Sequence, residues 1–129
     1  MTRKVIQPPT LPDPRPRYSH GIQTEGGTLL FIAGQVAADR EGNIVGKGEI
    51  DKQAVQVFEN LTAVLTAAGG SFENLVMTTT YLTDISYREG FNRIRGRYYG
   101  NTPPTNTLVI VKGLANRDYL IEISGIAVI

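Results

Sequence analysis

The chain has 129 residues, 41% of them hydrophobic, and its 13 Lys and Arg residues nearly balance 12 Asp and Glu, which predicts one folded domain over residues 1–129. The sequence contains no cysteine and a single histidine, which excludes disulfides, thiolate nucleophiles and metal sites built from cysteine or several histidines. The balanced charge provides no strong field for nucleic acid or an anionic membrane, so neither is an expected partner.

The N-terminal region is rich in proline: residues 7–17 hold five prolines in eleven positions. Proline fixes φ and has no N–H donor, so residues 1–17 are predicted to form an extended segment, with regular structure beginning near Tyr18. No signal peptide is visible, and no stretch approaches the roughly 20 apolar residues that span a bilayer. These features predict a cytoplasmic protein.

The first predicted strands flank Gly26-Gly27, a two-residue turn that favours a hairpin between residues 20–25 and 28–35. A helical period begins at Ile50, and its apolar positions share one face until Gly69-Gly70 supply a stop. The pattern therefore predicts a hairpin followed by a long amphipathic helix.

The second half of the chain alternates strands with one further helix. Leu75–Leu82 is rich in β-branched residues and is predicted to be a strand. Ser86–Glu89 has the pattern of a capping box that opens a helix, whose apolar positions continue to Tyr98. Two more apolar strands are predicted over Asn106–Val111 and Leu120–Ile129.

This order of elements predicts an α+β fold, a mixed sheet with two helices packed on one face. The helix between Phe31 and Val76 acts as a crossover and implies that part of the sheet is parallel. The opposite face has no cover within the chain, although strands such as Leu108–Val111 and Ile126–Ile129 are apolar. The sequence therefore predicts self-association through the open face.

Six short motifs follow one another along the chain. They are Tyr18-Ser19, Leu30–Gln35, Gln56–Gly69, Thr79–Asp84, Pro103–Thr107 and Ile121–Ala127. In this order, over nearly the whole chain from Tyr18 onward, they resemble the Rid (YjgF-like) family of imine and enamine deaminases. The resemblance implies a chorismate-mutase-like protomer that forms a barrel-like homotrimer, with a small-molecule cleft between subunits.

The same resemblance implies the site residues. In deaminating members of the family a glutamate positions the attacking water, while a tyrosine, a glycine carbonyl and an asparagine complete the pocket. These roles fall on Glu122, Tyr18, Gly34 and Asn92. An arginine binds the substrate carboxylate in those members, but Thr105 stands in its place here. A threonine hydroxyl donates one neutral hydrogen bond, which predicts an atypical pocket unsuited to the usual 2-imino acids.

Each of these residues also has a structural interpretation. Glu122 is the one carboxylate in an apolar strand, on the face of Ser124, and could act as a general acid or base or lie in solvent at a strand edge. Tyr18 could pack at the domain rim, and Asn92 could occupy a solvated helix position. Gly34 could mark a bulge instead of a ligand contact.

The remaining candidate residues favour no further chemistry. His20 could be a general base, but a lone histidine at the start of a strand is more often structural. Arg93 and Arg97 share a helix face while Arg95 points away, and a solvated helix surface explains them better than phosphate binding. A ribonuclease is therefore the least favoured function.

The favoured function is a Rid-like hydrolase acting on a small reactive imine or enamine, without cofactor or metal. Glu122 would position the water. The substrate would be oriented by Tyr18, Asn92, Thr105 and the Gly34 backbone. The alternative is a trimer that binds or senses a small ligand at its subunit interfaces without catalysis.

Overall fold

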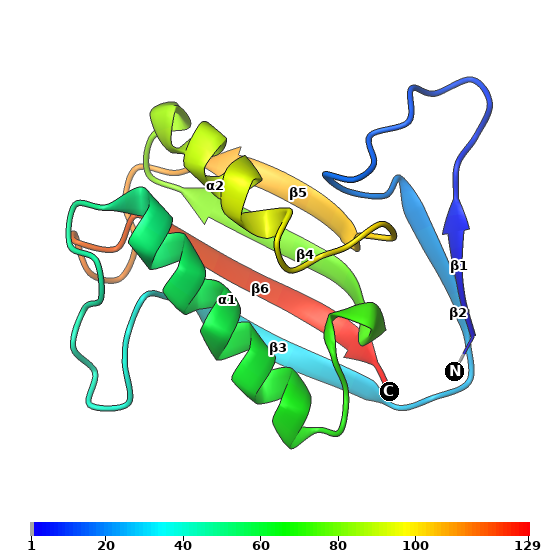
Figure 1. The fold of residues 1–129 in the computed structure, drawn as a ribbon, viewed down its shortest axis with the longest axis horizontal. Coiled ribbons are helices and arrows are strands. Elements are labelled where there is room, and N and C mark those ends of the chain that lie inside the picture. The colour runs from blue at the N-terminus through cyan, green and yellow to red at the C-terminus, as the bar shows by residue number, and fades with distance from the viewer. Residues whose placement is uncertain (1) are drawn as a thin grey trace.

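The computed structural model describes residues 2–129 as a four-stranded sheet, a two-stranded ribbon and two α-helices (Figure 1). The strands are β1 (Thr2–Ile6), β2 (Gly21–Glu25), β3 (Leu29–Gln35), β4 (Leu75–Leu82), β5 (Thr105–Ile110) and β6 (Ile121–Val128). The helices are α1 (Ile50–Ala67) and α2 (Arg88–Arg95), and two short 3-10 helices, η1 (Phe72–Asn74) and η2 (Ile85–Tyr87), flank β4.

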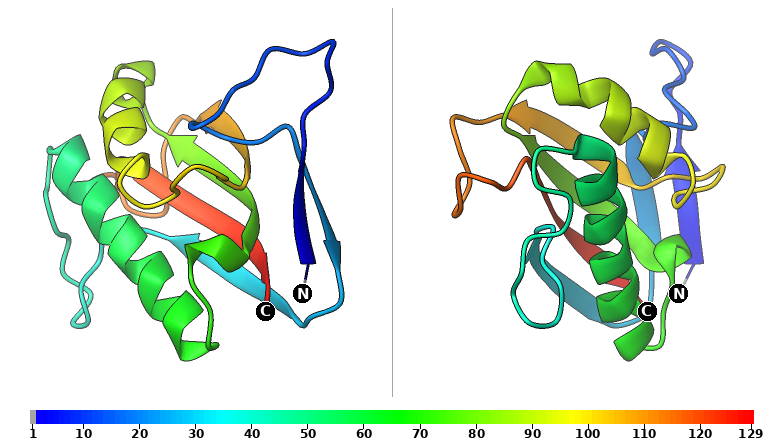
Figure 2. Two further views of the ribbon diagram at one scale, coloured as in Figure 1. Left: turned by 45° about the vertical axis from the view of Figure 1, so that its right-hand side comes forward. Right: turned by 60° about the vertical axis from the view of Figure 1, so that its left-hand side comes forward.

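The four-stranded sheet has the order β3-β6-β4-β5. Strand β6 runs antiparallel to both β3 and β4, whereas β4 and β5 are parallel. Both helices lie on the same face of this sheet (Figures 1 and 2). The prediction of an α+β fold with a mixed sheet and two helices on one face is therefore confirmed, and the parallel neighbours are the strands that α2 connects.

The core lies between the helices and the sheet. Apolar residues at helical spacing on α1 are fully buried: Ala54, Val57, Phe58, Leu61 and Leu65. The Phe58 ring stacks on Tyr98, with centroids 4.8 Å apart, and faces Phe91 at 6.3 Å. Burying one such side chain stabilises the fold by roughly 1.5–3 kcal/mol. Phe58 therefore links α1 to α2 and to the segment that follows it.

The predicted hairpin at Gly26-Gly27 is wrong. Strand β2 pairs with β1 and not with β3, in a register that sets Ile6 opposite Gly21, and β3 pairs with β6 instead. Regular structure therefore begins at Thr2, and the Pro-rich residues form the loop that joins β1 to β2. The apolar strand β3 gains more by pairing inside the four-stranded sheet, where Ile32 is buried and Leu30 packs against the core, than beside the more polar β2.

The helix ends give one confirmed and one wrong prediction. At the end of α1, Gly69 has a φ of +82° and the N–H of Gly70 donates to the Leu65 carbonyl at 2.8 Å, as the glycine stop predicts. The predicted capping box before α2 does not form. The Asp84 side chain accepts from the Ser86 N–H at 2.8 Å and opens η2, so that α2 starts later and ends at Arg95.

The sheet face opposite the helices is apolar and exposed. Phe31 is 70% exposed, Leu29 60% and Met77 47%. A shallow hollow of about 460 Å³ on this face is lined by Phe31, Met77 and neighbouring residues of β3, β4 and β6. This face is available for the predicted association of subunits. None of the helices within residues 2–129 has the length and apolar character that a membrane crossing requires.

Candidate functional site

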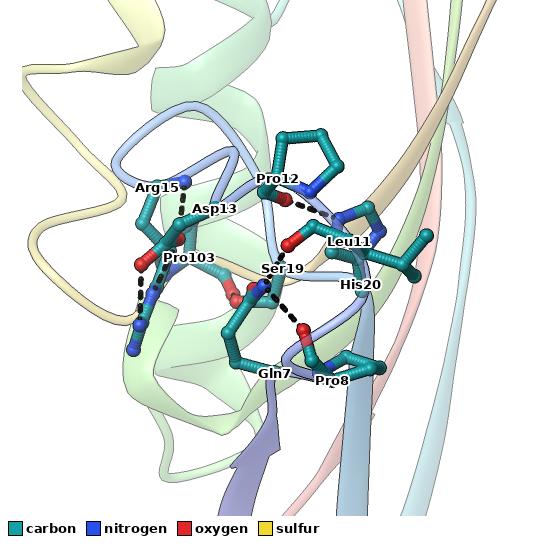
Figure 3. A network of polar contacts seen from close by, with 9 residues as sticks. All are labelled: Gln7, Pro8, Leu11, Pro12, Asp13, Arg15, Ser19, His20 and Pro103. Carbon is teal, nitrogen blue, oxygen red and sulfur yellow. Dashed lines mark hydrogen bonds and ion pairs between the residues drawn. The ribbon is translucent and has the colours of Figure 1, made fainter.

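The Pro-rich loop is attached to the start of β5, and this attachment positions Tyr18. The Ser19 hydroxyl donates to the Pro103 carbonyl at 2.5 Å (Figure 3). The Ser19 N–H donates to the Pro104 carbonyl at 3.1 Å. Ser19 is buried, so these two hydrogen bonds are shielded from water. They hold the neighbouring Tyr18 beside β5, although 84 positions separate Ser19 from Pro103.

Other polar contacts shape the loop itself (Figure 3). The Nε2 atom of His20 lies 2.7 Å from the Pro12 carbonyl oxygen. Arg15 and Asp13 form an ion pair at 2.6 Å, and hydrogen bonds from Arg15 lower the pKa of Asp13 to about 2. The contact of His20 with a main-chain carbonyl gives this histidine a structural role in the loop.

Tyr18 forms one wall of a groove between α2 and β5. The groove has a volume of about 440 Å³ and is lined by Tyr18, Ile85, Arg88, Arg95, Asn106, Leu108 and Ile110. We call this set of residues the Tyr18 groove. A second hollow of about 400 Å³ lies beneath the Pro-rich loop and shares Tyr18, Arg88 and Arg95 with it. The two hollows therefore form neighbouring parts of one depression.

The residue that distinguishes this groove is Arg95, which is only 5% exposed. Its guanidinium carbon lies 4.5 Å from the centre of the Phe91 ring, and its Nη2 atom donates to Asn92 Oδ1 at 2.5 Å. Within residues 2–129, its Nε and Nη1 atoms have no hydrogen-bond partner. The prediction that Arg95 lies on a solvated helix surface is therefore wrong, because this residue faces the groove.

The electrostatic setting of Arg95 is unfavourable to its own charge. Burial lowers the pKa of Arg95 to about 10, and the positive charges of Arg17 and Arg88 act in the same direction. The Tyr99 hydroxyl is also buried, and burial raises the pKa of this phenol. The groove thus contains a charged guanidinium whose N–H donors are only partly hydrogen-bonded within the subunit.

Two asparagines complete the polar lining. Asn92 holds the Arg95 guanidinium in place, as described above. The Oδ1 atom of Asn106 accepts from the Thr80 hydroxyl at 2.8 Å. Because its oxygen is engaged in this way, the amide nitrogen of Asn106 is the group left to donate into the groove.

A second cluster forms on the open face of the sheet, around Glu122. The ladder between β3 and β6 is interrupted between Ile32 and Gln35, which leaves Gly34 in a bulge. A Cβ atom added to Gly34 would lie only 2.7 Å from the Glu122 Cδ. Only glycine can therefore bring its backbone this close to the Glu122 carboxyl group.

The structure separates the predicted site residues into these two clusters. Tyr18 and Asn92 meet at Arg95, and Gly34 meets Glu122. Glu122 pairs with Tyr81 of β4, whereas Leu108 of the groove pairs with Thr80. Because adjacent residues of a strand face opposite sides, Glu122 and the groove lie on opposite faces of the sheet. Within one subunit the two clusters cannot act on the same small molecule.

Thr105 belongs to neither cluster. Its hydroxyl donates to the Val76 carbonyl at 3.0 Å, and its own carbonyl accepts from the Thr78 hydroxyl at 2.7 Å. The single hydroxyl proton is thus used inside the sheet, and only the oxygen lone pairs remain to contact a ligand. Arg93, a neighbour of Asn92, instead binds both carboxylate oxygens of Asp51 at 2.8 and 2.9 Å and lies outside the groove.

Sequence reasoning missed Arg95, although one signal was present. Arg95 follows Phe91 by four positions and Asn92 by three, so all three share one face of α2. Because Phe91 is a core aromatic residue, that face is the one turned inward. Within residues 2–129, no three His, Cys, Asp or Glu side chains come together as possible metal ligands.

Comparisons with known proteins extend over almost the whole chain. Residues 9–129 match the family model described as Endoribonuclease L-PSP. A RutC family protein of Saccharolobus solfataricus is 39% identical over 126 residues, which cover 97% of each chain. A RutC family protein of Synechocystis is 40% identical over 131 residues, which cover 100% of this chain and 98% of the relative.

Solved structures resemble this one along the full chain. A Yersinia pestis protein, YyfB, described as a Rid family protein of unknown function, superposes with a TM-score of 0.91 at 34% identity, covering 100% of both chains. RidA from the Antarctic bacterium Psychrobacter has a TM-score of 0.74 at 30% identity, covering 98% of this chain and 99% of the other. The arrangement of helices and sheet is therefore common to these proteins.

Proposed function

Because the chain belongs to the Rid (YjgF-like) family, we propose that it is a hydrolase that deaminates a small reactive imine or enamine. The observation that best supports this proposal is the close approach of Gly34 to the Glu122 carboxyl group. A carboxylate placed beside an exposed backbone segment in a strand bulge can hold a water molecule for attack on a bound substrate.

The proposed reaction converts an imine and water into a carbonyl compound and ammonia. As the water oxygen bonds to the carbon of the C=N group, Glu122 takes one proton from the water. It passes this proton to the nitrogen, which gives a carbinolamine. Glu122 then takes the proton of the carbinolamine hydroxyl and passes it to the amino nitrogen as the C–N bond breaks, so that the carbonyl forms and ammonia leaves. An enamine enters the same reaction once protonation at carbon converts it to the imine. A general acid–base group in this role contributes roughly 10²- to 10⁴-fold to a rate.

A complete site requires more than one subunit. Glu122 and the Tyr18 groove lie on opposite faces of the sheet, and the face of Glu122 also carries the exposed Phe31 and Met77. Proteins of this family are typically small homo-oligomers. We infer that the apolar face is buried in a homotrimer, in which residues of one subunit face Glu122 of the next and the small molecule binds between them.

A second candidate function is supported by one observation. The hydroxyl proton of Thr105 is engaged by the Val76 carbonyl, so this position lacks both the charge and the free donor that would bind a carboxylate there. A cleft without that contact fits a protein that binds or senses a small ligand without hydrolysing it. The two functions differ in turnover and not in binding.

A coupled assay separates the candidates. Imines would be made in place from a panel of amino acids by an amino acid oxidase, and their disappearance and ammonia release would be followed with and without the purified protein. Hydrolysis of at least one imine above the uncatalysed rate, at a protein concentration far below that of the substrate, would support the hydrolase. Binding of the corresponding 2-oxo acid without any acceleration would favour the ligand-binding protein.

A further inference from the structure

We propose that the Tyr18 groove binds the carboxylate of a small molecule, with Arg95 as its main donor and a short apolar tail lying on Ile85, Leu108 and Ile110. This inference deepens the proposed function and rests on it for the identification of the ligand as a substrate. The binding itself can be measured without turnover. In this chain the anion-binding position lies on α2 and not at Thr105.

The guanidinium of Arg95 has N–H donors without partners in the described chain. Arginine has five N–H donors, and the three on Nε and Nη1 of Arg95 have no partner within residues 2–129. A buried donor without a partner destabilises the fold, and a buried charge does so more strongly. Because Arg95 lines the groove, an anion bound there would satisfy these N–H groups. Phe91 and Asn92 hold the guanidinium beside that position.

The groove and the adjoining hollow carry an excess of positive charge. Arg15 is paired with Asp13 and Arg93 with Asp51, whereas no ion pair of Arg17, Arg88 or Arg95 occurs in the described part of the chain. The three latter residues line the two adjoining hollows. The groove is therefore positive although the whole chain has a net charge of only +1. A partly enclosed positive groove concentrates anions more effectively than a positive surface does.

The lining of the groove combines polar donors with apolar side chains. The polar donors Arg88, Arg95 and Asn106 share the groove with Tyr18 and with three apolar side chains. A volume of about 440 Å³ suits a small molecule. A planar carboxylate matches a guanidinium, and an apolar tail matches the wall formed by Ile85, Leu108 and Ile110. The groove thus fits a short 2-oxo or 2-imino acid better than a polyanion.

Two subunits are needed to bring the groove and Glu122 together. Arg95 and Glu122 of one chain lie on opposite faces of the sheet. A substrate held by Arg95 can meet a catalytic carboxylate only if Glu122 comes from a second copy of the chain. Carboxylate binding should therefore need Arg95 alone, whereas hydrolysis needs both residues and the assembled oligomer.

The test uses 2-oxobutanoate as the probe and butan-2-one, which lacks the carboxylate, as its neutral counterpart. Calorimetry and thermal unfolding of the full chain would be compared for wild type, Arg95→Met, Arg95→Lys, Arg88→Met and Arg93→Met. The wild type should bind 2-oxobutanoate and not butan-2-one, and binding should weaken as salt is added. Arg95→Met should weaken binding about tenfold or more, since bonds to charged groups are the strong class.

The other variants act as controls. Arg95→Lys should restore part of the binding because it keeps the charge without the planar donor group, and Arg88→Met should weaken it to a smaller extent. Arg93→Met should bind like wild type, because Arg93 pairs with Asp51 outside the groove. The melting temperature of Arg95→Met should equal or exceed that of wild type, since an apolar side chain replaces an unsatisfied buried charge. Weaker binding in a stable variant therefore reports on the groove.

Three outcomes would overturn the inference. They are equal binding of 2-oxobutanoate by wild type and Arg95→Met, no binding by wild type at millimolar concentration, and tighter binding of inorganic phosphate or a short RNA by the same arginines. If binding depends on Arg95 but no imine of the panel is hydrolysed, the carboxylate site stands and the proposed hydrolase fails. If imines are hydrolysed without dependence on Arg95, only the present inference fails.

Discussion

The two faces of β6 lie in very different environments. Ile121, Ile123 and Ala127 are fully buried beneath the helices, whereas Glu122 and Ile126 on the other face are only half-buried. The side chains of the covered face pack against other residues of the same chain, and this packing contributes to the stability of the fold. The open face carries an exposed apolar surface and the Glu122 carboxylate. The same strand thus supports the fold with one set of side chains, and we propose that the other set serves association and chemistry.

The sharpest test of this contrast is Glu122→Gln. The change keeps the size of the side chain, so the fold and melting temperature should remain those of wild type. Turnover of any imine hydrolysed by the wild type should fall by roughly 10²- to 10⁴-fold, as for other general acid–base groups. Glu41→Gln, in an exposed turn, is the matched control. Unchanged turnover in Glu122→Gln would show that the open face carries no catalytic carboxylate.

A substitution in the core beneath the covered face should lower the free energy of unfolding without a direct effect on catalysis. Phe58→Ala removes the ring that stacks on Tyr98 and faces Phe91. We expect a loss of about 3–5 kcal/mol in the free energy of unfolding, the range for large-to-small changes of a core aromatic residue. Denaturant titration measures this loss. A loss below about 1 kcal/mol would mean that this ring is not part of a closely packed core.

The exposed apolar surface should control association. Phe31→Asp places a charge in the face that we expect to be buried between subunits, so the variant should be a folded monomer at micromolar concentration, where we expect the wild type to be a trimer. Light scattering measures the mass. Leu11→Asp changes a residue that is also exposed, at 45%, but lies in the Pro-rich loop, and it should remain trimeric. A monomeric wild type would contradict the assembly altogether.

The smallest expected effect is that of Thr105→Val. Loss of the hydrogen bond to the Val76 carbonyl should reduce the free energy of unfolding by about 1 kcal/mol, and Thr105→Ser should retain most of it. If the hydroxyl only supports the sheet, the affinity for 2-oxobutanoate should stay the same in both variants. A loss of affinity in Thr105→Val but not in Thr105→Ser would show that the hydroxyl contributes to ligand binding.

The elements that were predictable from the sequence are those with long, regular patterns. The helix beginning at Ile50 was predictable because its apolar period continues over many positions and ends at two glycines. The strand containing Glu122 was predictable for the same reason. The partner of a strand was not, because a turn such as Gly26-Gly27 is compatible with a hairpin whether or not a more apolar partner exists elsewhere.

The site was predictable only in part, for a related reason. Helical spacing placed Arg95 on the face of Phe91 and Arg93 on another face, but it did not indicate that Arg95 lines a groove. That depends on Phe91 and on β5, whose position beside α2 is a property of the whole sheet. The contact of Ser19 with Pro103, which positions Tyr18, joins residues 84 positions apart. A contact between residues so far apart cannot be predicted from a local sequence pattern.

The ribbon of β1 and β2 stands beside the main sheet and not within it (Figures 1 and 2). A two-stranded ribbon is at most marginally stable by itself, so this one should open at a lower free energy than the sheet. Hydrogen exchange of amides such as that of Thr24 should therefore be faster than that of Ile123 in β6. Since the loop of the ribbon carries Tyr18, each such opening would also displace one wall of the groove and provide a route for ligand release.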